Sequence, residues 1–285
     1  MFVFAVKSNP DYPITLTQKL YDETTKRSYP YIQKHNNENV SYAICPDCKC
    51  PVRLVNRNRD EKVSATLYAM HVPYTVPELA IYDQVRYNRC NFRNPARMDG
   101  KARRDSTEDS ISLKIKDKIR EHFDLLVAII KIKTSVSFSN SVINQMLDDF
   151  VANKGHTYRA VTLYNIPYSF LYMTEAQDLY GCRVSKEIAD AINKKSDSFT
   201  CYYGSVVGRK KGQSSGTLIL FFSDHSLASK DSKETIQLNI SEVQNKKKPE
   251  EGKNIFNKKI EVDNTIFDNY IKIKADLLQL AKSKL

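Results

Sequence analysis

Three cysteines lie close together in the chain, in the segment Cys45-Pro-Asp-Cys48-Lys-Cys50. A Cys-x-x-Cys turn points two sulfur atoms at one centre, and zinc needs four nitrogen or sulfur ligands in tetrahedral geometry. The other two ligands must come from later in the chain, where His71 and Cys90 stand at spacings usual for a small zinc module. We therefore predict a structural Zn²⁺ site formed by Cys45, Cys48, His71 and Cys90. Cys50 either replaces His71 as a ligand or lies beside the metal as a free thiol.

Two other roles for these cysteines are less favoured. A disulfide is uncommon in a chain without a secretion signal. A redox Cys-x-x-Cys usually opens a helix, whereas Pro51 and the β-branched residues after it indicate a strand. A closed Cys3His site leaves no open position for water, so we expect the metal to support folding and not catalysis. The segment loosely resembles the zinc-ribbon and zinc-knuckle modules of nucleic-acid-handling proteins, a generic resemblance that identifies no family.

The positive charge of the chain is unevenly distributed. The formal net charge is +11, and residues 1–104 contain 17 Lys and Arg against 10 Asp and Glu. Arginine presents a planar fork that suits phosphate groups, so an Arg-rich segment suggests an anionic partner, with nucleic acid the first candidate. A solvated surface with internal ion pairs is the alternative explanation. The residues that we expect to contact phosphates around the zinc module are Arg53, Arg57, Arg59, Arg86, Arg89, Arg93 and Arg97.

The pattern of apolar residues predicts an α+β fold in four consecutive segments. These are an Arg-rich β and zinc-knuckle module over 1–104, a helical segment over 105–157, an antiparallel β domain with one short helix over 158–244, and a Lys-rich linker with a C-terminal amphipathic helix over 245–285. Within them, helical spacing predicts helices at 107–131, 141–153, 186–194 and 264–283. The linker itself is expected over 245–259.

An aromatic stretch is expected to form a strand at 164–172. Its even positions would place Tyr164, Tyr168, Phe170 and Tyr172 on one face, because side chains alternate along a strand. Such a face can fill a core, form an oligomer interface or stack on unpaired bases. Strands are also expected at 199–207 and 217–222, joined by a Gly- and Lys-rich hairpin.

No convincing catalytic set is present in the sequence. The Gly-x-Ser-x-Gly spelling around Ser214 follows a Lys-rich turn and precedes a strand, so it lacks the context of a nucleophile elbow. Adjacent Asp224 and His225 are the best remaining acid–base pair, although neighbours on an extended chain point apart. A metal-dependent nuclease that uses acidic residues after position 105 is a third, less favoured hypothesis.

We expect a non-enzymatic binding protein whose partner is nucleic acid or a protein complex that handles it. The alternative is an oligomeric inhibitor or accessory factor, of the kind found in phages and mobile elements, that covers a target protein. No apolar run reaches the roughly 18–20 residues that cross a bilayer, so we expect a cytoplasmic protein without membrane contact. The apolar face of the last predicted helix must be covered, which predicts a homo-oligomer.

Overall fold

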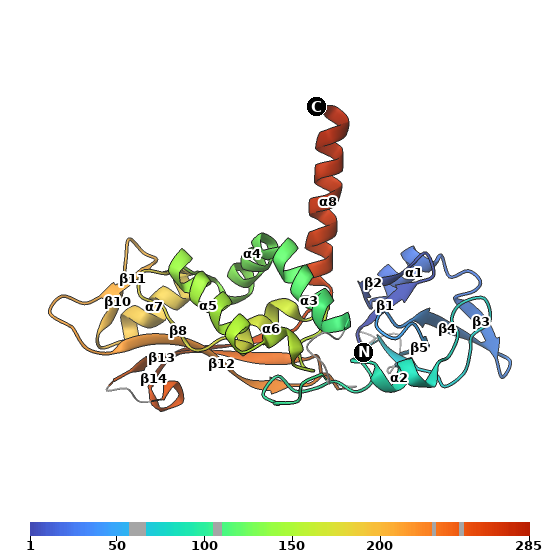
Figure 1. Ribbon diagram of the computed structural model, residues 1–285, viewed down its shortest axis with the longest axis horizontal. Helices are drawn as coiled ribbons and strands as arrows, with labels where there is room; N and C mark the ends of the chain where they lie inside the picture. The colour runs from blue at the N-terminus through green and yellow to red at the C-terminus, as the bar shows by residue number, and fades with distance from the viewer. Residues whose placement is uncertain (57–66, 105–109, 230–231, 245–247) are drawn as a thin grey trace. The chain divides into compact units, whose positions relative to one another are not determined.

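A computed structural model of the chain describes residues 1–56, 67–104, 110–229, 232–244 and 248–285 (Figure 1). The fold is α+β, as predicted, with antiparallel sheets and helices in the same chain. The described chain divides into two compact units. Unit 1 comprises residues 1–96, 227–233 and 263–285, and unit 2 comprises residues 97–226 and 234–262. Each unit therefore draws on separated stretches of the chain, whereas the sequence-based division follows it in four consecutive segments.

Unit 1 is built on an antiparallel sheet. Five strands lie in the order β2–β1–β4–β5–β6, and β3 pairs with the first half of β4. The strands are β1 (Val3–Val6), β2 (Asn9–Thr15), β3 (Ile32–His35), β4 (Glu38–Ile44), β5 (Pro51–Asn56) and β6 (Leu67–His71). Alternation along the strands divides the core between the two faces of the sheet, because successive side chains point to opposite sides. Phe4 and Ala43 pack in one buried cluster, and Ala5 and Tyr42 pack in the other.

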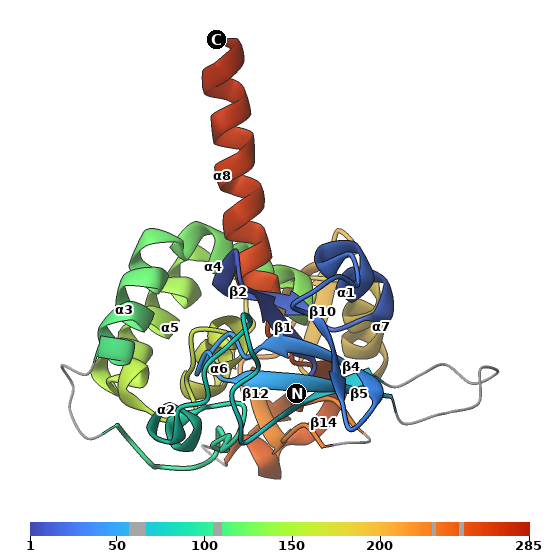
Figure 2. The ribbon, with the colours of Figure 1, turned by 90° about the vertical axis from the view of Figure 1, so that its right-hand side faces the viewer.

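Three helices accompany this sheet, namely α1 (Gln18–Thr25), α2 (Gln84–Arg89) and α8 (Ile266–Lys284). The start of α8 lies beside β2, as Figure 2 shows. Thr265 and Thr15 share a hydrogen bond of 2.9 Å between their hydroxyl groups, and the Tyr12 hydroxyl donates to the Asn269 side chain. These contacts anchor the first turn of the helix on the sheet.

Unit 2 contains two further antiparallel sheets. One has the order β14–β13–β12–β8 and the other β10–β11–β9–β7. The strands are β7 (Val136–Ser137), β8 (Gln177–Asp178), β9 (Arg183–Val184), β10 (Phe199–Tyr202), β11 (Val206–Arg209), β12 (Thr217–Ser226), β13 (Thr235–Val243) and β14 (Lys253–Glu261). Leu220 and Ile240 face each other across β12 and β13 and are buried, so this pair of long strands forms part of the core.

Helices gather over one face of the β12–β14 sheet (Figure 1). Phe170 stands at the centre of this layer, with its ring 5.0 Å from that of Phe150 and 6.3 Å from that of Phe123. The elements are α3 (Ser110–Glu121), α4 (Phe123–Thr134), α5 (Asn140–Ala152), α6 (Ile166–Met173), α7 (Lys186–Lys195) and the 3-10 turns η1 (Gly155–Thr157) and η2 (Pro249–Glu251).

The strand predicted at 164–172 is wrong, because this segment forms helix α6. Pro167 occupies the first turn of the helix, where its missing N–H costs no hydrogen bond. Six of the eight residues of α6 are buried, including Tyr168, Phe170 and Leu171. A helix that is buried all round has no polar face, so its sequence lacks the periodicity that distinguishes it from a strand.

Three other features differ from the sequence-based expectation: a helix, a strand pairing and the linker. The helix predicted at 107–131 is two helices, α3 and α4, because the backbone leaves the helical conformation at His122. Strands β10 and β11 form a hairpin with each other, and β12 pairs with β13, so the predicted pairing of 199–207 with 217–222 is wrong. Much of the predicted linker is strand β14, which pairs with β13 along the edge of the sheet. The lysines of β14 gave this segment the composition of a linker. Charged residues are, however, also common on edge strands, and β14 is one.

Nowhere in the part of the chain that the structure describes is a helix long and apolar enough to cross a membrane.

Candidate metal centre

The cysteine segment forms the turn between β4 and β5. The Cys45 N–H donates to the Cys50 carbonyl over 2.9 Å, and the Lys49 N–H donates to the Cys45 carbonyl over the same distance. These two bonds close the turn, and β4 and β5 continue from it as an antiparallel pair. The predicted hairpin arms on either side of the cysteines are therefore present. Because the turn is tight, Cys45 and Cys48 present their sulfur atoms to the same side.

Lys49 adopts a left-handed backbone conformation in this turn, with φ of 62°. Such a conformation is unusual for residues other than glycine. The Lys49 ammonium group is held by the Asp11 carboxylate at 2.6 Å and by the carbonyls of Pro10 and Pro46. These contacts from β2 and from the turn itself fix the conformation that the cysteines require.

The other two side chains arrive from separate elements. His71 is the last residue of β6, and its pairing with Val52 of β5 brings it beside the cysteine turn. Cys90 is the C-terminal cap of α2 and is buried. A hairpin and a short helix thus return the chain to the turn at the two positions that the spacing predicted.

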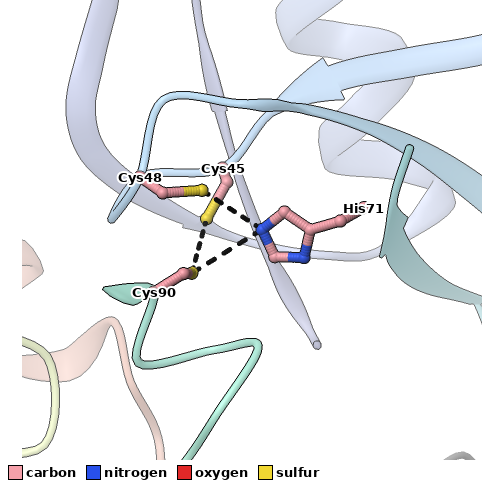
Figure 3. Close-up of side chains that lie close together, drawn as sticks. All are labelled: Cys45, Cys48, His71 and Cys90. Atoms are coloured by element: carbon pink, nitrogen blue, oxygen red, sulfur yellow. Dashed lines mark hydrogen bonds between the residues drawn. The ribbon is translucent and has the colours of Figure 1, made fainter. Parts of the chain in front are cut away.

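Four donor atoms converge at this point, as Figure 3 shows. The Cys45 and Cys90 sulfurs are 3.7 Å apart. The His71 Nε2 atom lies 3.3 Å from the Cys48 sulfur and 3.6 Å from the Cys90 sulfur. All four atoms lie within 4.8 Å of one another. The arrangement is compatible with a metal site whose ligands are three thiolates and one imidazole.

The three sulfurs share very little contact with water. Cys45 is fully buried, and Cys48 and Cys90 are 5% and 1% exposed. Burial raises the pKa of Cys45 well above its usual value, because a thiolate without a cation is costly in an apolar core. Hydrogen bonds from Cys45 and Cys90 lower the pKa of Cys48, so one negative charge is already stabilised at this position. A cation is the natural complement of such a donor set.

Cys50 lies outside the ligand quartet. Its thiol donates a hydrogen bond to the Asp83 carbonyl oxygen, at 3.4 Å, and the side chain is fully buried. Its backbone N–H bonds to the Cys48 sulfur and helps to lower the pKa of that thiol. Of the two roles that the sequence allowed, the geometry matches a free thiol beside the centre.

Several groups besides the four donor residues support the centre, and of these the sequence singled out only Arg93, as a phosphate contact. The Asp47 carboxylate accepts the Asn91 N–H at 2.7 Å, which fixes the backbone next to Cys90. The Tyr87 ring packs edge-on against His71 at 5.5 Å between ring centres. Arg93 lies over the Tyr87 ring at 5.3 Å and bonds to its hydroxyl at 2.7 Å. Only the hairpins and α2 bring these residues together, so their spacing in sequence carries no signal.

The seven predicted phosphate-contacting arginines lie on several elements. Arg86 and Arg89 belong to α2, and Arg93 lies three residues after Cys90; all three are exposed. Arg53 is on β5, and its Nε atom is buried without a hydrogen-bond partner among the described residues. Arg97 belongs to unit 2, where it forms an ion pair with Asp99 at 2.8 Å. Two of the predicted positions, Arg57 and Arg59, lie outside the described residues.

Asp224 and His225, the acid–base pair suggested by the sequence, do not bond to each other and have separate partners. His225 Nε2 lies 2.8 Å from the Glu234 carboxylate, and Nδ1 accepts the Met98 N–H at 2.9 Å. Asp224 instead accepts a hydrogen bond from Ser223. The His225 side chain is fully buried, which indicates a packing role. Cys182 is also buried, whereas Cys201 is partly exposed.

Within the described ranges, Cys45, Cys48, His71 and Cys90 form the only cluster of metal-ligating side chains. The assignment rests on this geometry, since no protein-family model, curated protein or solved structure matches the chain.

Proposed function

We propose that this chain is a non-enzymatic nucleic-acid-binding protein in which a structural Zn²⁺ ion holds an arginine-bearing surface of unit 1. The ion is inferred from the distances between donor atoms. With Zn–S bonds of about 2.3 Å and Zn–N bonds of about 2.0 Å, a tetrahedron has S···S edges of about 3.8 Å and S···N edges of about 3.5 Å. Three of the six corresponding distances here are 3.7 Å between the Cys45 and Cys90 sulfurs, and 3.3 and 3.6 Å between His71 Nε2 and the sulfurs of Cys48 and Cys90. All six lie within 4.8 Å.

Zinc is favoured over other divalent ions by the chemistry of the donors. Thiolate and imidazole are its preferred ligands, whereas magnesium and calcium select oxygen. Four protein ligands complete a tetrahedron and leave no position for a reacting water, so the ion serves folding. None of the six cysteines, all of which are described, forms a disulfide, which supports a reducing, cytoplasmic location.

The observation that carries the proposal is the attachment of α2 to the metal centre at both ends. Asp83, the N-terminal cap of α2, accepts the Cys50 hydrogen bond. Cys90, its C-terminal cap, is itself one of the four ligands. A helix this short is not stable by itself in water. The centre therefore fixes the orientation of Arg86 and Arg89, which α2 exposes.

The arginines of this α2 surface, which are Arg86, Arg89 and Arg93, suit phosphate contacts. Arg89 forms no ion pair with any described residue, so its charge is available to a partner. Arg86 is paired with Asp83 at 3.2 Å on the surface, where such pairs contribute little and exchange readily. Arg93 is held over Tyr87 and keeps an exposed guanidinium. Replacing counterions along a polynucleotide then supplies the binding free energy.

Fluorescence anisotropy with labelled DNA and RNA oligonucleotides at low salt tests this proposal. The double variant Arg86→Ala/Arg89→Ala is expected to bind more weakly and to reduce the slope of log affinity against log salt by about two. Lys19→Ala/Lys34→Ala removes the same charge from exposed positions of α1 and β3 and serves as the matched control. Absence of any binding by the zinc-loaded wild-type protein at low salt refutes the proposal.

A second candidate function is favoured by helix α8, and it is association between copies of the chain. Ile273, Leu277 and Leu280 are 54%, 59% and 54% exposed. They continue a row that begins with buried Ile266 and half-buried Tyr270, at successive spacings of four, three, four and three. This spacing is that of a coiled-coil seam. An oligomer formed in this way could cover a target protein, as an inhibitor or accessory factor does.

Light scattering distinguishes this candidate from a monomer. Leu277→Lys/Leu280→Lys is expected to convert an oligomer to a monomer without lowering the melting temperature of unit 1, because both positions are exposed in the single chain. Lys282→Ala on the same helix is the control. A wild-type protein that stays monomeric at high concentration contradicts this role of α8.

A further inference from the structure

Unit 2 carries a cluster of basic side chains that the α2 surface does not include. It forms where the segment 101–104 pairs with the segment after η1. Arg103 and Tyr158 make an isolated antiparallel bridge, and the Arg104 N–H donates to the Thr157 carbonyl at 2.8 Å. Residues that are some fifty positions apart in the chain are thereby placed side by side.

The guanidinium groups of this bridge are held by carbonyl and hydroxyl oxygens. Arg103 Nη1 bonds to the Thr157 hydroxyl at 2.7 Å, and its guanidinium lies over the Tyr158 ring at 4.0 Å. Arg104 Nη1 donates to the carbonyls of His156 and Tyr158. These neutral partners fix the orientation of the Arg103 guanidinium without cancelling its charge, which leaves that charge available to an anion.

Two lysines add to this charge. Lys154 is exposed, and its carbonyl accepts a hydrogen bond from Arg103. Lys116 is exposed on α3, which packs against η1. None of the described carboxylates forms an ion pair with Arg103, Lys116 or Lys154. Burial lowers the pKa of His156, and Lys116, Arg103, Arg104 and Lys154 lower it further, so positive charges surround the ring.

The backbone of Lys154 and Gly155, which lies beneath the cluster, is held by close packing against α5. Gly155 is buried, and a Cβ atom there would lie 2.3 Å from the Phe150 ring. The turn η1 therefore sits directly on the end of α5, and Lys154 is held in a left-handed conformation with φ of 48°. A preorganised cluster loses little conformational freedom when it binds a ligand.

We propose that Arg103, Lys116 and Lys154 form a phosphate-binding patch on unit 2 that contacts the backbone of a polynucleotide. The choice of a polynucleotide as the ligand rests on the proposed function. The patch adds a second binding surface, whose residues differ from those of the α2 surface. Phosphate is favoured over carboxylate ligands because the Arg103 guanidinium and two lysines together offer several positive charges to one dense polyanion.

Anisotropy titrations with a labelled oligonucleotide over a range of salt concentrations test the patch. Lys116→Ala/Lys154→Ala is expected to reduce the slope of log affinity against log salt by roughly two. Lys186→Ala/Lys194→Ala removes two exposed lysines of α7 in the same unit and is expected to leave the slope unchanged. Equal melting temperatures of the two variants establish that folding is intact.

The outcomes separate this inference from the proposed function. If Arg86→Ala/Arg89→Ala weakens binding and Lys116→Ala/Lys154→Ala does not, the patch is refuted and the α2 surface stands. The reverse result refutes the α2 surface and supports the patch. A parallel titration with inorganic pyrophosphate identifies the source of the phosphate. Binding of pyrophosphate that depends on Lys116 and Lys154, without binding of the oligonucleotide, overturns the assignment to a polynucleotide.

Discussion

The Cys50 thiol donates its hydrogen bond to the carbonyl oxygen of Asp83, across 3.4 Å, and so joins the cysteine turn to the start of α2. Asp83 also caps α2 by accepting the Arg86 N–H at 2.8 Å. One residue therefore connects the metal centre with the helix that carries the exposed arginines. The arrangement predicts that loss of the metal disturbs α2 before it disturbs unit 2.

Removal of the metal is expected to unfold unit 1 and leave unit 2 folded. The four ligands tie together β4, β6 and α2, whereas unit 2 has its own core of helices and sheets. Elemental analysis should find one zinc per chain. Calorimetry with and without a chelator should show one transition lost or lowered and one unchanged. His71→Ala should reproduce the effect of the chelator, and Cys201→Ser should not, because Cys201 lies in unit 2. A single transition that is insensitive to chelator contradicts a structural ion.

Replacement of Cys50 should preserve the metal. Because Cys50 lies outside the quartet, Cys50→Ser is expected to retain one zinc per chain, whereas Cys48→Ser should lose it. The buried site makes some loss of stability unavoidable, at about 1 kcal/mol for an altered hydrogen bond. Metal content after dialysis is the measurement. Loss of zinc from Cys50→Ser at the level of Cys48→Ser would instead identify Cys50 as a ligand.

Glu242 should give unit 2 a stability that falls in acid. Its buried carboxylate accepts hydrogen bonds from the Ser196 hydroxyl and from the N–H groups of Asp197 and Ser198, at 2.7 to 3.0 Å. Burial alone acts to raise the pKa of Glu242, but hydrogen bonds from Ser198, Ser196 and Asp197 together hold the pKa below its ordinary value of 4.5. A lowered folded-state pKa contributes stability above the unfolded value, and this contribution is lost as the pH falls through the folded one.

The variant Glu242→Gln tests this relationship. At neutral pH it is expected to destabilise unit 2 by about 2 kcal/mol, because an amide cannot accept all the bonds that the carboxylate accepts. The difference between the variant and the wild type should shrink as the pH is lowered below about 4.5. Urea denaturation at several pH values is the measurement, and Glu187→Gln, at an exposed position of α7, is the control. A difference that is constant down to pH 3, well below the unfolded pKa, contradicts the assignment.

Gly155 should tolerate no side chain. A Cβ atom would approach the Phe150 ring to 2.3 Å, and Phe150 is itself buried. Gly155→Ala is therefore expected to destabilise unit 2 by about 1 to 3 kcal/mol through overpacking. The double variant Gly155→Ala/Phe150→Leu should recover part of the loss, because the smaller side chain leaves room for the methyl group. Purely additive effects of the two substitutions would show that the two residues do not compete for space.

Helices with one apolar face were predictable from the sequence. Helix α5 follows Ser139, whose hydroxyl accepts the Val142 N–H, and α7 follows Ser185 in the same way. A capping residue followed by apolar residues at helical spacing is sufficient to locate such elements. Helix α6 could not be located, because Tyr168 and the residues around it are buried on every side. Strand β14 was missed for the opposite reason, since its exposed lysines resemble a linker.

The sequence alone was sufficient to predict which side chains form the candidate metal centre, because cysteine and histidine at these spacings are typical of a metal site. It did not determine which of the neighbouring thiols is left out. That choice belongs to the β4–β5 hairpin, in which Cys50 turns toward Asp83 and His71 arrives on β6. Likewise, the basic residues are evident in the chain, but only the bridge between Arg103 and Tyr158 places Lys154 beside them. Local patterns record which side chains are present and which face of an element they share, whereas contacts between distant segments depend on backbone pairing that no local pattern specifies.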